Sequence, residues 1–485
     1  MSGTCRTITG DNIAATAVDL FAKCTLEAML YGPWKTSANV NMLSQVKIAH
    51  QVAVSVHTKT DGQRLEFGGC SQYRISKSLD YMGDVWLCLV LPQMRLRADT
   101  TINRLASLRF KPGWMASLVR RVRFRVQDLL LSEADTFASQ IHNHAMVDCC
   151  HRDNMNVLCG NTQEFLNQGA WNGSAFDSVG LARDVCCRLP VFPVKSGHNA
   201  RPFIAGAAVF NDLHIEVELN ELSDILEIYN GVCGTPALNG SANGRAATFA
   251  DVETCEGTCP EVINSHLIIN GAVGTPEEKK ALARMVSTQA LKLYSYSCAE
   301  TFNCYGDTVM TLRLSLGIVG IYFAVINVTH GRNSSNYTTL DGGLGVCPWD
   351  CAELRFENTV RHTTTPALSI LSSIAYSSTD SNQLSCVGFI PFSFDTPSAH
   401  ITSSLQASRV SDLVLHVTAS PEASRACDGY DHNGAAIPVA EGNPACVSGV
   451  QDPTQPGQKQ RFTLVAVAAQ VATIKYVRAA VQMVV

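Results

Sequence analysis

The sequence predicts an all-β protein built from two consecutive β-sandwiches. Short runs rich in Val, Leu and Phe recur along the chain, several of them alternate with polar residues, and Gly, Pro, Asn or Asp bound them. This is the chemistry of strands. Helical patterns are rare, and 485 residues are too many for one sandwich. The strand-like runs are residues 51–57, 84–92, 119–126, 213–219, 311–328, 413–417 and 462–467.

The composition favours a large buried core and no direct binding of nucleic acid. Hydrophobic residues make up 46% of the chain and charged residues 16%, with a formal net charge of −5. A nucleic-acid-binding protein usually clusters its basic residues, because neutralising phosphates supplies most of its affinity. The densest basic segment here is Arg120, Arg121, Arg123 and Arg125, which alternates with Val122, Phe124 and Val126. That alternation predicts one strand with a charged face.

Two segments carry a helical pattern. In residues 11–31, Asp11 can cap the first turn and apolar residues follow at spacings of three and four. In residues 275–291, Thr275 can cap and Pro276 stands at the first helical position. We expect the first to be an N-terminal helix or arm, and the second a helix lodged in a loop between strands.

A domain boundary is predicted next to Tyr229. A long strand-like segment ends there, and a stretch rich in Gly, Asn and Ala begins at Gly231. The expected division is an arm at residues 1–34, a first sandwich at 35–229 and a second at 230–485. The two halves share no strong sequence repeat, so any duplication would be visible in the structure alone.

The N-terminus predicts no secretory route and no membrane span. Its first residues, MSGTCRTITGDN, are polar and lack an apolar core. The longest nearly apolar run, residues 316–326, is about half of the roughly 20 residues that a spanning helix needs. We expect this run to be a buried strand.

The cysteines are candidates for disulfides rather than for a metal site. There are 19 of them, scattered without a paired CxxC zinc spacing. Three close pairs lie in polar, turn-rich segments and are the candidate disulfides: Cys255 with Cys259, Cys298 with Cys304, and Cys347 with Cys351. Residues 141–151 hold the densest set of potential metal ligands, but their spacing matches no standard zinc site.

Residues 327–365 are the candidate outer loop, because they combine several turn-forming stretches. Three N-x-Ser/Thr sequons gather here, at Asn327, Asn333 and Asn336. They are the candidate glycan sites, although a chain without a secretory signal is not expected to meet the ordinary glycosylation machinery.

No catalytic residue, cofactor site or metal site is expected. The sequence holds no GxSxG, HExxH, GxxxxGK[S/T] or GxGxxG motif in a suitable strand–helix context. His400, near Ser398 and Ser403, is interpreted as a turn residue. The sequence therefore predicts a structural or binding protein rather than an enzyme.

Several segments resemble the major capsid proteins of the nucleocytoplasmic large DNA viruses. In residues 65–92, Phe67-Gly68 leads to a strand, then Asp80, then a strand that closes on Leu91-Pro92. Residues 113–147 are similar to the family's strand, polar turn and helix. In residues 188–226, Leu189-Pro190 and Phe210-Asn211-Asp212 match the family's pattern, with Pro202-Phe203-Ile204 where Leu-Pro would be expected.

The second half carries two further resemblances. Residues 392–417 resemble the family's Pro-Ser-Gly turn at Pro397-Ser398, but Ala399 replaces the glycine. A position with positive φ would resist alanine, so the geometry of this turn differs or relaxes. Residues 461–485 look like the family's closing pair of strands, with Gln470 to Ile474 as the reduced landmark.

The resemblance implies two eight-stranded jelly rolls side by side, and a function in self-assembly. It implies a homotrimer with a pseudo-hexagonal outline that tiles an icosahedral shell, assembled inside the host cell. It also implies neighbouring trimers, minor capsid proteins and a penton protein as partners. We expect the N-terminal arm to reach these proteins or an internal membrane, or else to pack on its own subunit. The alternative is a jelly-roll protein for carbohydrate binding or host attachment, with its site in the loops.

Overall fold

A computed structural model describes most of the chain from residue 47 onward. The described residues are 47–54, 65–75, 79–97, 107–111, 113–147, 152–161, 184–193, 203–208, 211–229, 244–273, 288–329, 331, 335–340, 345–377, 386–394, 396, 403–410, 412–439, 446–447, 450–451, 456–477 and 480–484. The predicted helix at 11–31, and the arm at 1–34, lie outside them.

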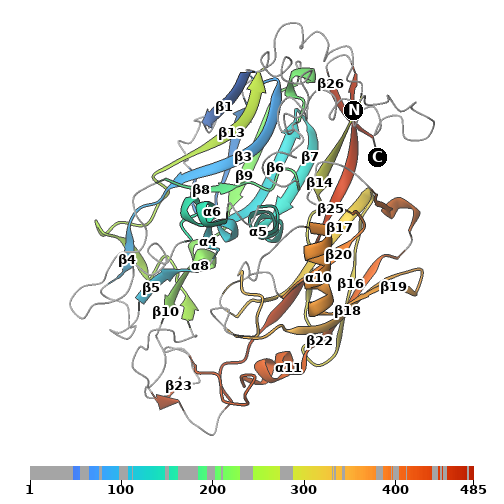
Figure 1. The fold of residues 1–485 in the computed structure, drawn as a ribbon. Coiled ribbons are helices and arrows are strands. Elements are labelled where there is room, and N and C mark those ends of the chain that lie inside the picture. Colours follow the sequence, from blue (N-terminus) through green and yellow to red (C-terminus); the bar gives the residue numbers. More distant parts are fainter. Residues whose placement is uncertain are drawn as a thin grey trace.

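The first half folds into two sheets that face each other across a core. One sheet has the order β1-β13-β3-β8 and the other β2-β9-β6-β7, all neighbours antiparallel (Figure 1). The strands of the first sheet are β1 Lys47–Val54, β13 Asn264–Val273, β3 Tyr81–Val90 and β8 Asp184–Arg188. Those of the second are β2 Cys70–Ile75, β9 Leu213–Leu219, β6 Val119–Val126 and β7 Leu129–Asp135.

The second half repeats this arrangement. One sheet follows the path β14-β25-β17-β20, and the other has the order β16-β22-β18-β19. The first path is built from β14 Thr288–Tyr294, β25 Phe462–Val477, β17 Gly317–Asn327 and β20 Val387–Pro391. The facing sheet is built from β16 Asp307–Thr311, β22 Val414–Ala419, β18 Trp349–Phe356 and β19 Thr359–Thr364.

Both halves are jelly rolls with the same connectivity. In each, the first, eighth, third and sixth main strands in chain order form one sheet, and the second, seventh, fourth and fifth form the other. The two predicted jelly rolls are therefore confirmed, and we call them the first roll and the second roll. The duplication that the sequence hides is visible in the order of the strands.

Short strands extend these sheets or pair in the loops. The additional strands are β4 Met94–Leu96, β5 Ser107–Phe110, β10 Leu226–Tyr229, β11 Gly244–Ala246, β12 Val252–Thr254, β15 Cys298–Thr301, β21 Leu405–Gln406, β23 Cys446–Val447, β24 Val450–Gln451 and β26 Ala480–Val484. Among them, β15, β21 and β26 join the seven-stranded sheet of the second roll.

Helices are few and short, as the sequence predicts. The α-helices of the described chain are α4 Trp114–Leu118, α5 Thr136–Ala145, α6 Arg152–Leu158, α8 Leu222–Ile225, α10 Pro366–Ser377 and α11 Pro421–Asp428, and two 3₁₀ turns are Ala205–Ala207 and Ala407–Arg409. In the part of the chain that the structure describes, none of the helices has the length and apolarity needed to cross a membrane.

The predicted domain boundary at residues 229/230 does not agree with the pairing of the strands. Strand β11 pairs with β10, β12 with β4, and β13 with both β1 and β3. Residues 244–273 thus complete the first roll, because its central strand β13 comes after the glycine-rich stretch. We propose that the boundary lies at residues 274–287.

Two sequence expectations need correction. The predicted helix at 275–291 cannot run to its end, because Thr288–Tyr294 form strand β14, which pairs with β25; residues 274–287 lie outside the described residues. The candidate outer loop at 327–365 contains the hairpin of β18 and β19, whose turn places Glu357 and Asn358 at positive φ. The turn-forming residues in this region mark the ends of separate strands rather than one continuous loop.

The apolar run at 316–326 is the buried strand that the sequence predicts. Strand β17 is buried over its whole length. Ile321, Phe323 and Val325 face the core of the second roll, while Tyr322 and Ala324 face away from that core into a separate apolar cluster. A strand covered on both faces needs apolar side chains at every position, and this explains the lack of alternation.

Candidate functional site: the contact between the two rolls

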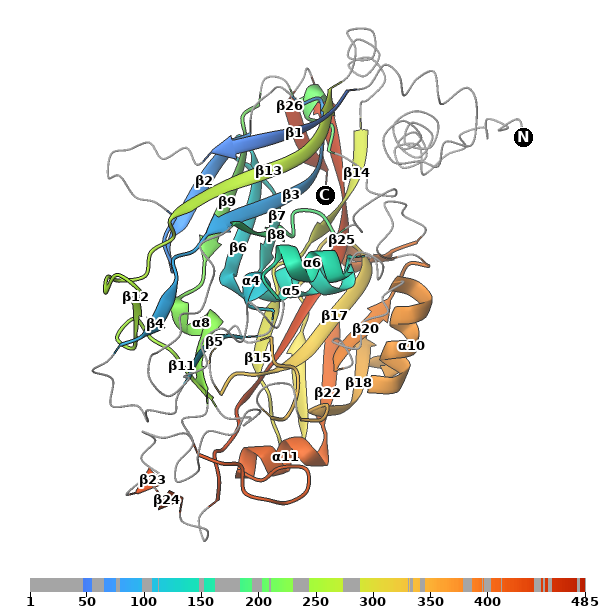
Figure 2. The same cartoon turned by 60° about the vertical axis from the view of Figure 1, so that its left-hand side comes forward.

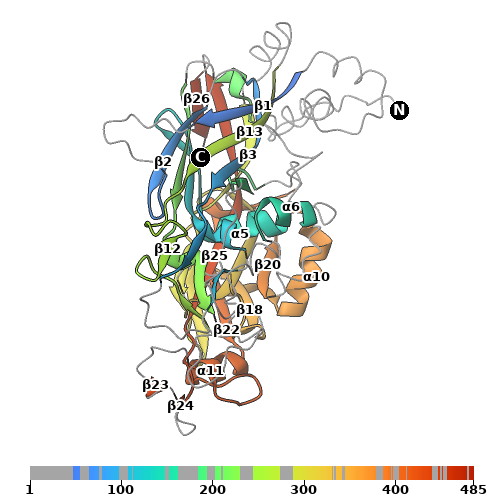
Figure 3. The same cartoon turned by 90° about the vertical axis from the view of Figure 1, so that its left-hand side faces the viewer.

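An apolar cluster joins the two rolls, and we call it the inter-roll cluster. Helix α5, which follows β7 of the first roll, contributes Phe137, Ala138 and Ile141. The second roll contributes the outer faces of β17, β20 and β25 (Figures 1 and 3). Its members from that side are Tyr294, Tyr322, Ala324, Ile326, Tyr337, Cys386, Val387, Phe389, Val465 and Val467. Buried apolar contact of this extent fixes the angle between the rolls.

Polar contacts set the position of α5 within this cluster. The carboxylate of Asp135 caps the helix by accepting from the Ala138 N–H at 3.1 Å. The same carboxylate accepts from Ser297 Oγ of the second roll at 2.6 Å. Burial raises the pKa of Asp135, while the hydrogen bonds oppose that rise. One partly buried carboxylate therefore starts the helix and ties it to the other roll.

Two buried side chains on α5 reach hydroxyl groups of the second roll. Tyr337 Oη donates to Gln140 Oε1 at 2.5 Å, and His142 Nδ1 lies 2.9 Å from Tyr294 Oη. Burial holds the pKa of His142 well below its usual value, and the nearby Arg188 lowers it further. His142 is thus neutral in the folded protein.

Replacing His142 with glutamine should reduce the pH dependence of stability. Because the folded state holds His142 neutral, the unfolded chain binds the proton first as the pH falls below about 6.5. The free energy of unfolding should therefore fall by up to about 1.4 kcal/mol per pH unit below that point. Urea unfolding of wild type and His142→Gln at pH 7.5 and 5.5 measures this. The exposed His432→Gln is the matched control; equal slopes for all three proteins would contradict the prediction.

A buried arginine links the end of α5 to the first roll. Arg188 on β8 donates through Nε and Nη2 to Asp84 Oδ1 at 3.0 and 2.6 Å, and through Nη1 to the carbonyl of Met146 at 3.0 Å. Asp84 lies on β3, the neighbour of β8. The arginine therefore joins two strands and the residue that ends α5.

The basic strand predicted at residues 119–126 is confirmed, and its charges are paired. Arg120, Arg123 and Arg125 lie 3.0, 3.0 and 3.1 Å from Glu218, Glu133 and Glu216 on the adjoining strands. Cross-strand pairs of opposite charge stabilise a sheet modestly. The glutamates neutralise this face, so it is not a free cationic surface for phosphates.

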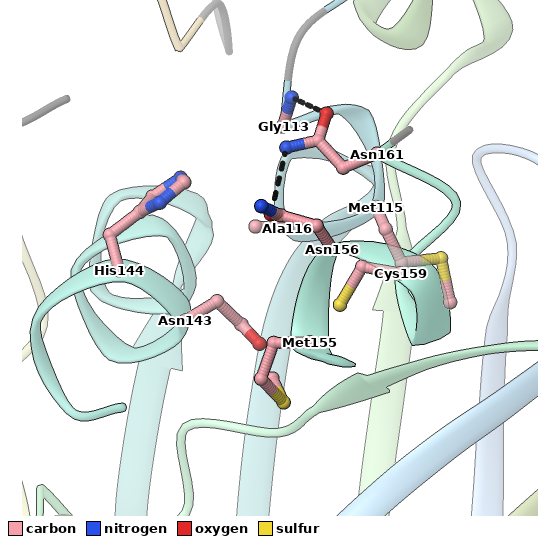
Figure 4. A pocket seen from close by; sticks show the side chains of 9 residues that line it. All are labelled: Gly113, Met115, Ala116, Asn143, His144, Met155, Asn156, Cys159 and Asn161. Atoms are coloured by element: carbon pink, nitrogen blue, oxygen red, sulfur yellow. Dashed lines mark hydrogen bonds between the residues drawn. The ribbon is translucent and has the colours of Figure 1, made fainter. Parts of the chain in front are cut away.

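A small cavity lies beside three helices of the first roll. Figure 4 shows this cavity of about 30 Å³ beside α4, α5 and α6, where the Gly113 N–H donates to Asn161 Oδ1 at 3.0 Å. His144 and Cys159 also line it. This volume admits water and not a metabolite.

A larger groove of about 1030 Å³ follows the seam between the rolls. Arg121 and the exposed Tyr296 lie at it, with the guanidinium 5.4 Å from the ring centre. Asp135 also lines the groove, but its carboxylate is engaged by Ser297 and the start of α5. Within the described part of the chain, no three His, Cys, Asp or Glu side chains gather as metal ligands would.

The candidate disulfides from the sequence are not the ones that the structure forms. Cys304 bonds to Cys427, 123 residues later. The other members of the three close pairs, Cys255, Cys259, Cys298, Cys347 and Cys351, form no disulfide. Closeness along the chain did not predict the pairing of Cys304, because helix α11 brings Cys427 to the turn between β15 and β16.

Two of the three candidate glycan sites are engaged within the protein. Asn327 is buried and donates to Gln460 Oε1 at 2.9 Å, while Thr329 Oγ1 donates to its amide oxygen. Asn336 donates to the carbonyl of Leu340 at 2.9 Å. Asn333 lies outside the described residues. A glycan on Asn327 is incompatible with this fold, because its amide nitrogen is covered.

Comparison with known proteins finds similarity to viral major capsid proteins. A family model described as "Major capsid protein N-terminus" matches residues 44–253. The major capsid protein of Frog virus 3 (isolate Goorha) is 22% identical over 374 residues, covering 73% of this chain and 76% of the ranavirus protein. That of Wiseana iridescent virus is 21% identical, covering 68% of this chain and 66% of its own.

Solved structures show the same fold. A PBCV-1 virus capsid subunit superimposes with a TM-score of 0.59 at 10% identity, covering 91% of this chain and 97% of its own. The Faustovirus major capsid protein superimposes with a TM-score of 0.57 at 10% identity, covering 96% of this chain and 98% of its own. The chain has the double jelly roll fold of these capsid proteins, and its first half matches the model of their N-terminal domain. Its role is structural, and its place is the capsid shell of the virion.

A structural role in a capsid explains why the inter-roll cluster matters. A capsid protein works through the shape that it presents to other subunits, and here a buried cluster fixes that shape. The sequence missed α5 as a functional element, because its contacts with the second roll are far apart along the chain. The unbroken run of apolar residues in β17 is the signal that could have revealed a second covered face.

Proposed function

We propose that three copies of this chain assemble into a trimeric capsomer with a pseudo-hexagonal outline, and that such capsomers tile an icosahedral shell. The observation that carries this proposal is the pair of rolls with one strand order, held side by side by the inter-roll cluster. Each copy thereby supplies two similar bodies, and three copies supply six. A closed ring of this kind leaves each copy in the same environment.

The remaining partners follow from the same assembly. Neighbouring trimers would meet at the outer edges of the rolls, and minor capsid and penton proteins would fill positions that trimers cannot. We further propose that the arm at residues 1–34 reaches these proteins or an internal membrane. Trimers that lack the arm and still build normal shells would contradict that role. Enzymatic activity has no part in the proposal.

The test is the mass of the purified full-length chain by light scattering, with and without reductant. We expect three times the chain mass of 52.3 kDa under both conditions. The Cys304–Cys427 bond lies within one chain, so its reduction should not separate copies. A monomer under both conditions would overturn the trimer and favour a binding protein with the same fold.

A further inference from the structure

Helices α5 and α10 occupy the same position in the two rolls. Each follows the fifth main strand of its roll, β7 or β19, and precedes the sixth, β8 or β20. Each also bonds to that sixth strand: Asn143 Nδ2 donates to the carbonyl of Arg188 at 3.0 Å, and Ser369 Oγ donates to that of Val387 at 3.2 Å. The helices are structural counterparts.

The counterparts share one buried residue. The fourth residue of each is a serine, Ser139 in α5 and Ser369 in α10, and both are fully buried. They differ two positions later. The sixth residue is Ile141 in α5, which is 0% exposed, and Leu371 in α10, which is 60% exposed.

Helix α10 presents a broad apolar face to its surroundings. The large apolar side chains that it exposes are Leu368, Ile370, Leu371 and Ile374. In Figure 2 the helix stands at the edge of the molecule beside β20, whereas α5 lies between the two rolls. A monomeric soluble protein rarely exposes such a cluster on one helix, so this face fits an interface.

The surface that covers α5 has a defined pattern. On the outer face of the second roll, Tyr322 of β17 stands directly opposite Val467 of β25, and the next outward pair is Ala324 with Val465. All four belong to the inter-roll cluster that receives α5.

The first roll carries the same pattern on its own outer face. Trp86 of β3 stands directly opposite Ile268 of β13, and the next outward pair is Cys88 with His266. The intervening residues, such as Leu87 and Leu267, face the core. Trp86 and Ile268 are only partly buried. This face therefore repeats the receiving surface of α5, one roll earlier in the chain.

We propose that α10 docks on the Trp86–Ile268 face of the first roll in a second copy of this chain. The contact repeats between copies what α5 does on the Tyr322–Val467 face within one copy. It rests on the proposed trimer, because a ring of six similar bodies needs three contacts within chains and three equivalent contacts between chains. The partner is a second copy because the receiving pattern is found in this chain itself.

The variant Leu371→Glu tests the contact in the full-length protein. A charged side chain at the centre of the α10 face would be buried without a partner in each of the three interfaces. We expect the midpoint concentration for trimer dissociation to rise at least about tenfold, measured by sedimentation velocity and light scattering. Val309→Glu is the matched control, since Val309 is 53% exposed on β16 of the other sheet; it should remain trimeric.

A photo-crosslinking amino acid at position 371 provides a second measurement that does not depend on the charged variant folding. Mixed isotope-labelled and unlabelled copies distinguish bonds between chains from bonds within one. Crosslinks between copies to peptides that contain Trp86 or Ile268 would support the contact.

Three outcomes separate the two proposals. A monomeric wild type overturns the trimer and this contact with it. A trimeric wild type with an equally stable Leu371→Glu trimer overturns the contact alone, as do crosslinks to another surface of the neighbouring copy.

Discussion

Replacing Arg188 with methionine should lower the free energy of unfolding by about 3–5 kcal/mol. The guanidinium side chain is 2% exposed and its partner Asp84 18% exposed. Removing the arginine leaves the Asp84 carboxylate and the Met146 carbonyl without their shared donor in a region that water reaches poorly. Methionine has a stem of similar length to that of arginine but makes none of its hydrogen bonds. The loss of stability therefore comes mainly from the unpaired polar groups.

Urea unfolding, followed by fluorescence, measures this change. Arg74→Met is the matched control, because the Arg74–Asp212 pair has a similar distance of 2.9 Å but is 55% and 41% exposed. An exposed pair of this kind contributes about 1 kcal/mol or less. A loss of unfolding free energy in Arg188→Met no larger than that in Arg74→Met would contradict the prediction. Since Arg188 also holds the end of α5, its loss should further weaken the proposed trimer.

The second large effect is expected for Gly388→Ala. Gly388 on β20 stands directly opposite Phe323 on β17, with the ring of the phenylalanine folded over the glycine. A methyl group at position 388 would overlap that ring, which is fully buried in the core of the second roll. Overpacking at such a site costs about 1–3 kcal/mol, and more when the backbone cannot move.

A compensating change makes this prediction specific. In the Gly388→Ala background, Phe323→Leu should restore stability, because a smaller side chain vacates the space that the new methyl group needs. The same Phe323→Leu change in the wild type should be destabilising, since it leaves a cavity. Gly306→Ala is the control, because a methyl group there approaches only the flexible side chain of Asn303. Additive effects of the two changes would contradict the clash.

The class of fold and seven of the strands, β1, β3, β6, β9, β17, β22 and β25, follow from local sequence patterns alone. Alternating residues in 119–126 and 213–219 coincide with β6 and β9, because each strand has one face on a core and one toward water. The run at 316–326 could be read as a buried strand for the complementary reason, that a strand covered on both faces tolerates no polar position. The resemblance to capsid proteins rested on segments of this kind.

Only the tertiary structure decided which of these segments meet. Strand β13 completes the first roll from beyond the expected boundary, and Cys304 finds Cys427 rather than Cys298. Such partners are set by the packing of sheets, and no local pattern encodes them. The same holds for α5 and α10. Both are helices that follow the fifth strand of a roll, yet one is buried by the other roll and the other exposes its leucines and isoleucines. Under the proposed contact, a chain with two rolls satisfies the first of these contacts by itself, and the second requires another copy.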